Sequence, residues 1–260
     1  MALSPEQIER AAELLAAARR DVKVIGGLPE DCRPGNLEEA YAIRDSLVAK
    51  TGWPISGWFC ACTNRDIQEL LGLAEPYYAC LLKPFIRPSP CQLLSIEFPP
   101  MVLECEVAFT LGADLPPRDQ PYSREEVEAA VATAHPAIEV VAGHLREWPS
   151  QDVFSVIADN GTDGALVYGA GIAGWREIDL VALSVRLLVN GEQVRHGSGA
   201  NVLGDPMTAL VWLANAGVEG GLKAGQIHNT GTTTPIYWVG PGDHAVADFG
   251  PLGEAELEVL

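Results

Sequence analysis

The sequence predicts an α+β protein in which helices come first and strands follow. Helix signals are concentrated in residues 1–75, where capping residues precede apolar positions at helical spacing. From about residue 80 prolines become frequent, and short apolar runs follow one another between turn residues. Because these runs do not alternate regularly with helices, we expect an antiparallel or mixed sheet rather than a doubly wound parallel one. We therefore predict a small, mainly helical region over 1–75 and a β-rich domain over 76–260.

Three helices are expected in the first region. Ser4-Pro5-Glu6-Gln7 combines an N-cap, a proline at the first helical position and a glutamine at the third. Asn36 can cap a second helix, which ends at Thr51-Gly52. A short third helix is expected from Thr63 to Gly72, and segments rich in glycine and proline lie between these elements.

The strands expected in the second region are apolar runs bounded by turn residues. They cover residues 101–111, 137–141, 165–168, 181–189, 236–239 and a terminal run through Leu257. Asn190-Gly191 stands between two such runs, which is the typical signal of a type I′ hairpin. Two helices interrupt the strands, one beginning at Ser123 and one running from Asp205 to about Ala216.

Composition and charge argue against several classes of protein. The chain has 35 acidic residues against 17 lysines and arginines, a formal net charge of −18. Such a polyanion is a poor partner for nucleic acid and is repelled by anionic lipid. The N-terminus has no features of a secretory signal, no apolar run reaches about 18 residues, and the six cysteines lack the spacing of a zinc site. We therefore expect a cytoplasmic protein with free thiols that binds neither nucleic acid nor membrane.

Three glutamates in strand-like segments are candidate metal ligands. Glu104 and Glu106 share one face of the strand over 101–111, roughly 7 Å apart at Cα. On spacing alone, a half-exposed edge strand with a charged outer face is a slightly better explanation of this pair. Glu139, however, is the only charge in an apolar segment from 131 to 141, and isolated carboxylates of this kind are rarely buried unless they are paired or bind metal. Together the three favour a hard cation with oxygen ligands, Mg²⁺ or Mn²⁺.

Several short blocks between residue 55 and the C-terminus carry recognisable motifs. They are Glu104-Cys105-Glu106-Val107-Ala108-Phe109, His135-Pro136-Ala137-Ile138-Glu139, Val156-Ile157-Ala158-Asp159-Asn160, Gly197-Ser198-Gly199-Ala200 followed by the segments at 203–206 and 211–215, and the endings at 222–225 and 247–253. In this order they resemble the blocks of the fumarylacetoacetate hydrolase superfamily, on its 2-keto-4-pentenoate hydratase and 4-oxalocrotonate decarboxylase branch. Each block alone is weak evidence of ancestry, and together they are strong evidence.

The resemblance implies a mixed β-sandwich roll preceded by a small helical region, with 76–260 as the catalytic domain. It implies that Glu104, Glu106 and Glu139 hold Mg²⁺ or Mn²⁺ and that a 2-oxo acid is chelated through its carboxylate and 2-oxo oxygen. A metal there stabilises charge that develops on an enolate oxygen. The residues then expected to contact substrate are Asp159, Asn160, Thr230, Gly231 and Thr232. Hydratases of this branch form rings and larger assemblies, so a homo-oligomer is also expected.

The chain departs from the family pattern at positions that usually transfer protons. Phe59 stands where the family has the lysine of G-x-K-x-G-x-T-S, and Tyr77 stands at the acidic position of P-D-[FY]-G. After Glu139 the family usually has D-S-R, whereas this chain has Ala142-Gly143-His144. Tyr77, His144 and Tyr78 are conceivable replacements as proton carriers, although a packing or surface role is the better explanation of each one taken singly. Phe59 is expected to line a more apolar substrate pocket together with Trp58 and Tyr77.

These features predict a divalent-metal-dependent lyase, hydratase- or dehydratase-like, that acts on a 2-oxo acid or its enol with altered chemistry. A decarboxylase is the main alternative, and tautomerisation or hydrolysis of a C–C bond also remains open. The alternative from another class is a non-catalytic homologue that keeps the fold for ligand binding or as a scaffold.

Overall fold

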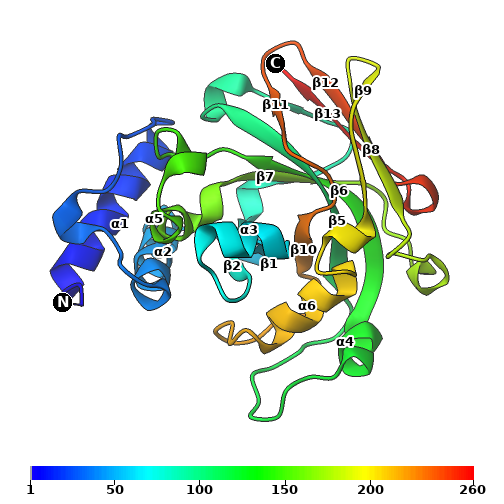
Figure 1. The fold of residues 1–260 in the computed structure, drawn as a ribbon, viewed down its shortest axis with the longest axis horizontal. Helices are drawn as coiled ribbons and strands as arrows, with labels where there is room; N and C mark the ends of the chain where they lie inside the picture. The colour runs from blue at the N-terminus through cyan, green and yellow to red at the C-terminus, as the bar shows by residue number, and fades with distance from the viewer. Residues whose placement is uncertain (1) are drawn as a thin grey trace.

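A computed structural model describes residues 2–260 and contains two curled β-sheets with helices around them (Figure 1). The larger sheet consists of β1 (Ile55–Ala61), β2 (Tyr77–Leu82), β3 (Ile86–Pro88), β5 (Met101–Leu111), β6 (Val131–Val141), β7 (Asp163–Tyr168), β10 (Ile227–Thr232) and β11 (Tyr237–Val239). Its path is β2-β1-β10-β5-β6-β7-β3, and β11 pairs with β5 beside that path. The β1–β10 and β3–β7 pairs are parallel and the other pairs antiparallel, so the sheet is mixed, as expected.

The smaller sheet completes the sandwich. It consists of β4 (Cys91–Leu93), β8 (Ser184–Val189), β9 (Glu192–Ser198), β12 (His244–Asp248) and β13 (Glu254–Val259), in the order β4-β13-β12-β8-β9. The predicted hairpin joins β8 to β9 through Asn190 and Gly191, whose φ values of 54° and 83° are those of a type I′ turn. The α+β class and the mixed β-sandwich roll are confirmed.

The helices are α1 (Pro5–Arg20), α2 (Leu37–Thr51), α3 (Arg65–Leu71), α4 (Arg124–Ala130), α5 (Val153–Ala158) and α6 (Pro206–Asn215). The capping residues explain the boundaries of the first two. Ser4 and Gln7 form a reciprocal capping box at the start of α1, and the Asn36 side chain caps α2. Gly52 ends α2 in the left-handed conformation at φ 66°. The five predicted helices are confirmed to within two residues at their starts, and the sequence analysis missed α5.

The strands that the sequence analysis missed include β1 and β2. Both strands belong to the larger sheet, and β1 lies between β2 and β10. The sheet therefore begins at residue 55, so a boundary drawn at residue 75 separates β1 from the strands with which it pairs. Helix α3 lies between β1 and β2 in the chain, and its helix signals mask the two short strands on either side.

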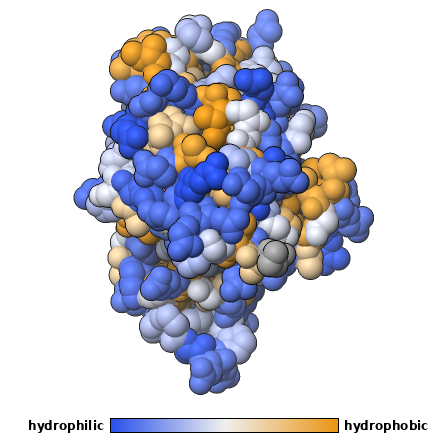
Figure 2. Space-filling view, turned by 90° about the vertical axis from the view of Figure 1, so that its left-hand side faces the viewer, coloured by the Kyte–Doolittle hydropathy of each residue, from blue (hydrophilic) through white to orange (hydrophobic). Residues whose placement is uncertain are grey.

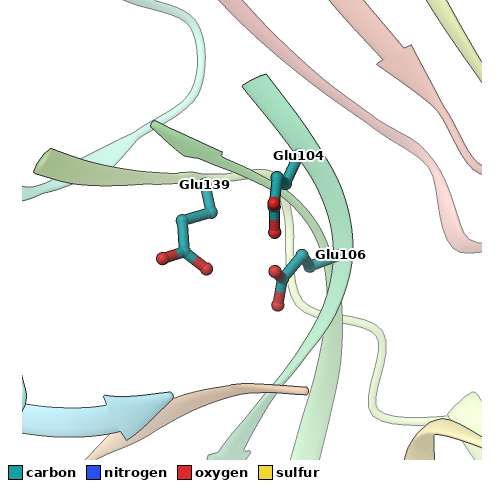
Figure 3. A group of neighbouring side chains, drawn as sticks. All are labelled: Glu104, Glu106 and Glu139. Atoms are coloured by element: carbon teal, nitrogen blue, oxygen red, sulfur yellow. The ribbon is translucent and has the colours of Figure 1, made fainter. Parts of the chain in front are cut away.

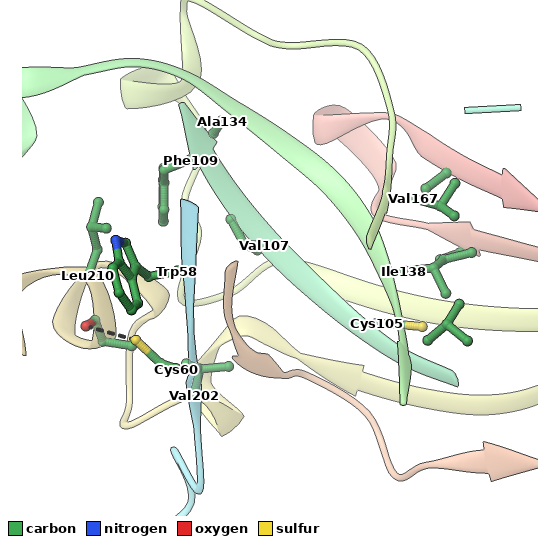
Figure 4. Close-up of a cluster of buried hydrophobic side chains, with 14 of the residues drawn as sticks. Trp58, Cys60, Cys105, Val107, Phe109, Ala134, Ile138, Val167, Val202 and Leu210 are labelled. Atoms are coloured by element: carbon green, nitrogen blue, oxygen red, sulfur yellow. Dashed lines mark hydrogen bonds between the residues drawn. The ribbon is translucent and has the colours of Figure 1, made fainter. Parts of the chain in front are cut away.

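The main core lies between the two sheets and under α6 (Figure 4). One side of β5 supplies Cys105, Val107 and Phe109 to this core, and the neighbouring β6 supplies Ile138. All four side chains are fully buried. The strand residues that alternate with them point to the opposite face of the larger sheet, because successive side chains of a strand alternate. Glu104 and Glu106 are therefore on the face that does not meet the smaller sheet.

The N-terminal helices α1 and α2 pack together and dock on α5 at one side of the sheets (Figure 1). A buried ionic cluster joins α1 to the rest of the chain. Arg19 of α1 lies 2.7 Å from the carboxylate of Asp163 and 3.5 Å from that of Asp159, and it also donates to the backbone carbonyls of both. His144 adds its backbone N–H to Asp159 at 2.7 Å. These groups are almost inaccessible to water, so each charge depends on its partners.

The surface is mostly polar. Figure 2 shows the side that carries the N-terminal helices, where hydrophilic side chains dominate and hydrophobic ones gather in separate small patches. Among residues 2–260, none of the helices combines the length and the apolar character needed to cross a bilayer.

The Arg19 cluster generates a prediction about stability. Arg19→Met removes the cation from two buried carboxylates, and breaking a buried pair in this way typically costs about 3–5 kcal/mol. We expect a correspondingly lower free energy of unfolding by equilibrium urea denaturation. The control is Arg10→Met, which removes the exposed ion pair of Arg10 with Asp31 and should change stability little. Equal effects of the two substitutions would contradict the role given to the cluster.

Candidate metal centre

The antiparallel pairing of β5 with β6 brings three carboxylates onto one face of the larger sheet (Figure 3). Glu104 lies directly opposite Glu139, and Glu106 is the next residue of β5 on the same face. One oxygen atom of each side chain lies within 4.8 Å of the others. Glu106 and Glu139 are buried, and Glu104 is half-buried. The structure thus brings the three predicted ligands together.

Burial and mutual repulsion oppose ionisation of this triad. Burial raises the pKa of Glu104 to about 8, with a further contribution from Glu106. Burial, followed by the charges of Glu106 and Glu104, raises the pKa of Glu139 well above its ordinary value. Burial also raises the pKa of Glu106, although hydrogen bonds to its carboxylate act in the opposite direction. Without a cation, the triad can relieve repulsion only by holding protons.

The donor set fits a hard divalent cation. The leading contributions to the three pKa values come from burial, from the glutamates themselves and from hydrogen bonds, and include no lysine or arginine. Glu106 Oε1 is buried and has no hydrogen-bond partner. A buried carboxylate oxygen without a donor is costly unless a cation faces it. Three carboxylates at this separation match the oxygen ligands that Mg²⁺ and Mn²⁺ prefer.

Strand β10 adds two hydrogen-bond donors to the site. The side chain of Asn229 is fully buried and its Nδ2 donates to Glu106 Oε2 at 2.9 Å and to Glu139 Oε2 at 2.7 Å. The backbone N–H of Gly231 donates to the same Glu106 oxygen at 2.6 Å. The sequence analysis missed Asn229. The available signal was an asparagine, a residue depleted in strands, directly before Thr230-Gly231-Thr232.

Gly231 is required at its position by conformation and by space. The pairing of β10 with β5 shifts register between Asn229 and Thr232, so the chain bulges there and directs the Gly231 N–H inward. Gly231 has φ 102°, and a Cβ atom would lie 1.8 Å from Thr63 Oγ1. The neighbouring hydroxyls serve the backbone: Thr230 donates to Val107 O at 2.9 Å and Thr232 to Thr234 O at 2.7 Å.

The two aromatic departures from the family pattern meet beside the triad. Phe59 packs with apolar residues that include Ala108 and Ala137, which lie on the same face of β5 and β6 as the glutamates, each two residues from one of them. A Cβ atom on Gly161 would lie about 3 Å from both the Phe59 and Tyr77 rings, so the two rings converge there. The expectation that Trp58 joins them is wrong. Trp58 neighbours Phe59 in β1 and therefore points to the opposite face, into the main core (Figure 4).

Tyr77 lies within electrostatic range of the carboxylates. Burial is the main cause that raises the pKa of its phenol well above the ordinary value. Electrostatic interactions with Cys62, Glu139 and Glu104 raise it further. The phenol consequently keeps its proton at neutral pH. Cys62 is half-buried, and burial with the charge of Glu104 raises the pKa of its thiol to about 12. Two weakly acidic, protonated groups therefore lie near the triad.

Three other predicted site residues have partners elsewhere. His144 and Asp159 belong to the buried cluster around Arg19, where His144 Nδ1 lies 3.5 Å from Asp159 Oδ1. Asn160 forms two hydrogen bonds of 2.9 Å with the backbone of Cys80 in strand β2. The structure gives these side chains partners that join parts of the fold, so we leave them out of the proposed site. The part of this segment that faces Phe59 and Tyr77 is Gly161.

The chain is similar in sequence and structure to proteins of one family. Residues 88–260 match the family described as Fumarylacetoacetate (FAA) hydrolase C-terminal. The 2-keto-4-pentenoate hydratase of Paraburkholderia xenovorans (strain LB400) is 32% identical over 98% of this chain and 96% of that protein. The structure of 4-oxalocrotonate decarboxylase from Pseudomonas putida G7, complexed with magnesium and adipate, has a TM-score of 0.91 and 27% identity, and covers 99% of both chains. By sequence and by fold, the chain belongs to the fumarylacetoacetate hydrolase family.

Proposed function

We propose that this chain is a divalent-metal-dependent lyase of the hydratase type that acts on a 2-oxo acid or its enol. The observation that carries the proposal is the triad of Glu104, Glu106 and Glu139, which converge without a cationic side chain among the groups that dominate their pKa values. Relatives named as hydratases match nearly the whole chain, and the decarboxylase structure contains magnesium. Mg²⁺ or Mn²⁺ is the cofactor that fits these ligands.

Within this proposal, the residues of the site have separate tasks. The three glutamates bind the cation, which, when bound, stabilises negative charge on the enolate oxygen of the substrate. Phe59 cannot carry a proton, so it takes no part in proton transfer. Tyr77 is buried near the triad with a raised pKa, which suits a group that holds and donates a proton. Phe59 and Gly161 form the wall against which the substrate packs.

The apolar wall favours a substrate with an uncharged tail. Phe59 packs with Ala79, Leu81, Ala108 and Ala137 on the face that carries the triad. Arg19 is held by Asp159 and Asp163 in the separate cluster described above, so it is not free for a substrate. Neither Arg19 nor the apolar wall therefore offers a cationic partner to the second carboxylate of a dicarboxylic substrate. This supports a hydratase-like reaction on a monocarboxylate over decarboxylation of a dicarboxylate, the alternative that the decarboxylase structure raises.

We further propose that the chain is a cytoplasmic homo-oligomer. Its six cysteines are free thiols, as is usual in a reducing compartment.

Leu94, Ile96 and Leu260 are exposed hydrophobic residues, 43%, 82% and 45% accessible. They lie on adjacent segments, because Ser95 N donates to Leu260 O and Leu260 N to Leu93 O. Such a patch is suited to contact a second copy. The charge of −18 supports the absence of nucleic-acid and membrane partners.

The metal centre predicts a pH-dependent affinity. Because a cation must displace the protons that the raised pKa values retain, Mg²⁺ should bind more tightly as the pH rises from about 6 to 8, with release of protons. Calorimetric titration in two buffers of different ionisation enthalpy measures both quantities. Glu106→Gln should abolish tight binding, whereas the surface variant Glu30→Gln should bind like the wild type. Affinity that is independent of pH and of Glu106 would exclude the site.

The same shifts predict how metal-free protein responds to pH. The folded triad retains protons that the unfolded chain loses between the ordinary carboxyl pKa of 4.5 and the value of about 8 for Glu104. The folded state therefore binds more protons in this window, and its stability should fall as the pH rises through it. Saturating Mg²⁺ should remove most of this fall. Thermal unfolding with EDTA and with Mg²⁺ across the window provides the measurement.

The substitution at Phe59 predicts weak activity on the ordinary hydratase substrate. A general acid–base group contributes about 10²–10⁴-fold, so turnover of 2-hydroxypenta-2,4-dienoate with Mg²⁺ should be low in the wild type. Phe59→Lys should raise it, and Phe59→Met, a flexible side chain without a proton to transfer, should not. Loss of substrate absorbance is the assay. Robust wild-type turnover would show that the chemistry is not altered.

The exposed patch predicts the effect of a charge on assembly. Ile96→Asp should reduce the mass measured by sedimentation equilibrium, because it buries a charge at a contact between copies. Leu70→Asp is the matched control: Leu70 is 78% accessible on α3, away from the patch. A wild-type mass equal to one chain at micromolar concentration would argue against assembly.

A further inference from the structure

One side chain connects two of the proposed metal ligands. Asn229 Nδ2 is 2.9 Å from Glu106 Oε2 and 2.7 Å from Glu139 Oε2. The two glutamates lie on different strands, β5 and β6, and Asn229 lies on a third, β10. Since β5 separates β10 from β6, the amide passes over the face of β5 to reach Glu139. A single planar group therefore sets the positions of two carboxylates on adjacent strands.

The orientation of the amide follows from its partners. Ionised carboxylates only accept hydrogen bonds, so the amide must present its NH₂ group to them, and Oδ1 must point away. Asn229 Oδ1 is buried and has no hydrogen-bond partner. An unpartnered buried oxygen is unfavourable for the stability of the fold. A purely structural role therefore does not account well for an asparagine here, and what the side chain provides is its pair of N–H donors.

The donors act on one oxygen of each ligand. Glu106 Oε2 accepts from both Asn229 and Gly231, which leaves Glu106 Oε1 as the oxygen without a partner. Glu139 Oε2 is likewise occupied by Asn229. With one oxygen of each carboxylate held by hydrogen bonds, the side chains are oriented to offer the other oxygen to a cation. A site of this kind presents single oxygens at fixed positions, which suits the small octahedral Mg²⁺ better than the larger Ca²⁺ with its more flexible coordination.

We propose that Asn229 is a positioning residue of the metal centre that fixes Glu106 and Glu139 for one-oxygen coordination and so selects Mg²⁺ or Mn²⁺ over Ca²⁺. This inference rests on the proposed function, because it takes the triad as a metal site. Asn229 binds neither the cation nor the substrate. It acts through the carboxylates, as hydrogen-bond partners of metal ligands commonly do.

The test compares the affinities of Mg²⁺ and Ca²⁺ by calorimetric titration of the full chain. Asn229→Leu keeps the approximate size of the side chain and removes the amide. Loss of a partner of a metal ligand typically costs about 10–100-fold in affinity, so Mg²⁺ should bind that much more weakly. Ca²⁺, which accepts two oxygens from one carboxylate, should lose less, and the ratio of the two affinities should fall. Asn229→Gln keeps the amide but places it one methylene further out, so the ratio of the two affinities should be intermediate. This variant still tests the role of the amide if Asn229→Leu does not fold.

The matched control is Thr233→Val, which removes another buried hydrogen bond of the same segment, from Thr233 Oγ1 to Cys105 O at 2.7 Å. It should lower the melting temperature and leave the Mg²⁺ to Ca²⁺ ratio as in the wild type. A ratio unchanged in both Asn229 variants, or a ratio that Thr233→Val lowers equally, would overturn the role of Asn229. Wild-type protein that binds neither cation would instead overturn the proposed metal site itself.

Discussion

The rest of the site depends on a charge constraint: three carboxylates converge on one buried face, and they cannot all ionise without a positive charge between them. Burial raises the pKa of Glu104 to about 8 and that of Glu139 well above its ordinary value. The surrounding chain provides hydrogen-bond donors rather than cations. Asn229 and the bulge at Gly231 supply N–H groups, and the side chain of Phe59 supplies neither a donor nor a cation. In the proposed function a divalent cation supplies the missing positive charge, and the structure of the related 4-oxalocrotonate decarboxylase contains magnesium.

The docking of the N-terminal helix α1 explains the partners of two of the predicted site residues. Asp159 and His144 join Arg19 in a buried cluster between α1 and the sheet. The Asn160 side chain forms hydrogen bonds with the backbone of β2. The residue that follows it, Gly161, lies against Phe59 and Tyr77. Asp159 therefore stabilises the docking of α1, Asn160 holds the turn against β2, and Gly161 packs against the two aromatic rings.

Replacement of the usual lysine by Phe59 changes the character of the site as a whole. With Phe59 and Tyr77 packed around Gly161, the region beside the triad is aromatic and has no cation among the groups that govern the triad's pKa values. Within the proposed function, the metal orients the substrate at its charged end and packing orients it at the other end.

Local patterns in the sequence determined the helix caps at Ser4 and Asn36, the hairpin at Asn190, the common face of Glu104 and Glu106, and the family. These are properties of residues a few positions apart, where helical and strand periodicity decide direction. The sequence did not show that Trp58 and Phe59 face opposite ways, because β1 was not recognised as a strand. Only the tertiary structure placed Asn229 over β5 and brought Arg19 and His144 to Asp159. Such contacts join residues as much as 140 positions apart, and they depend on strand order, register and helix docking, which no local pattern encodes.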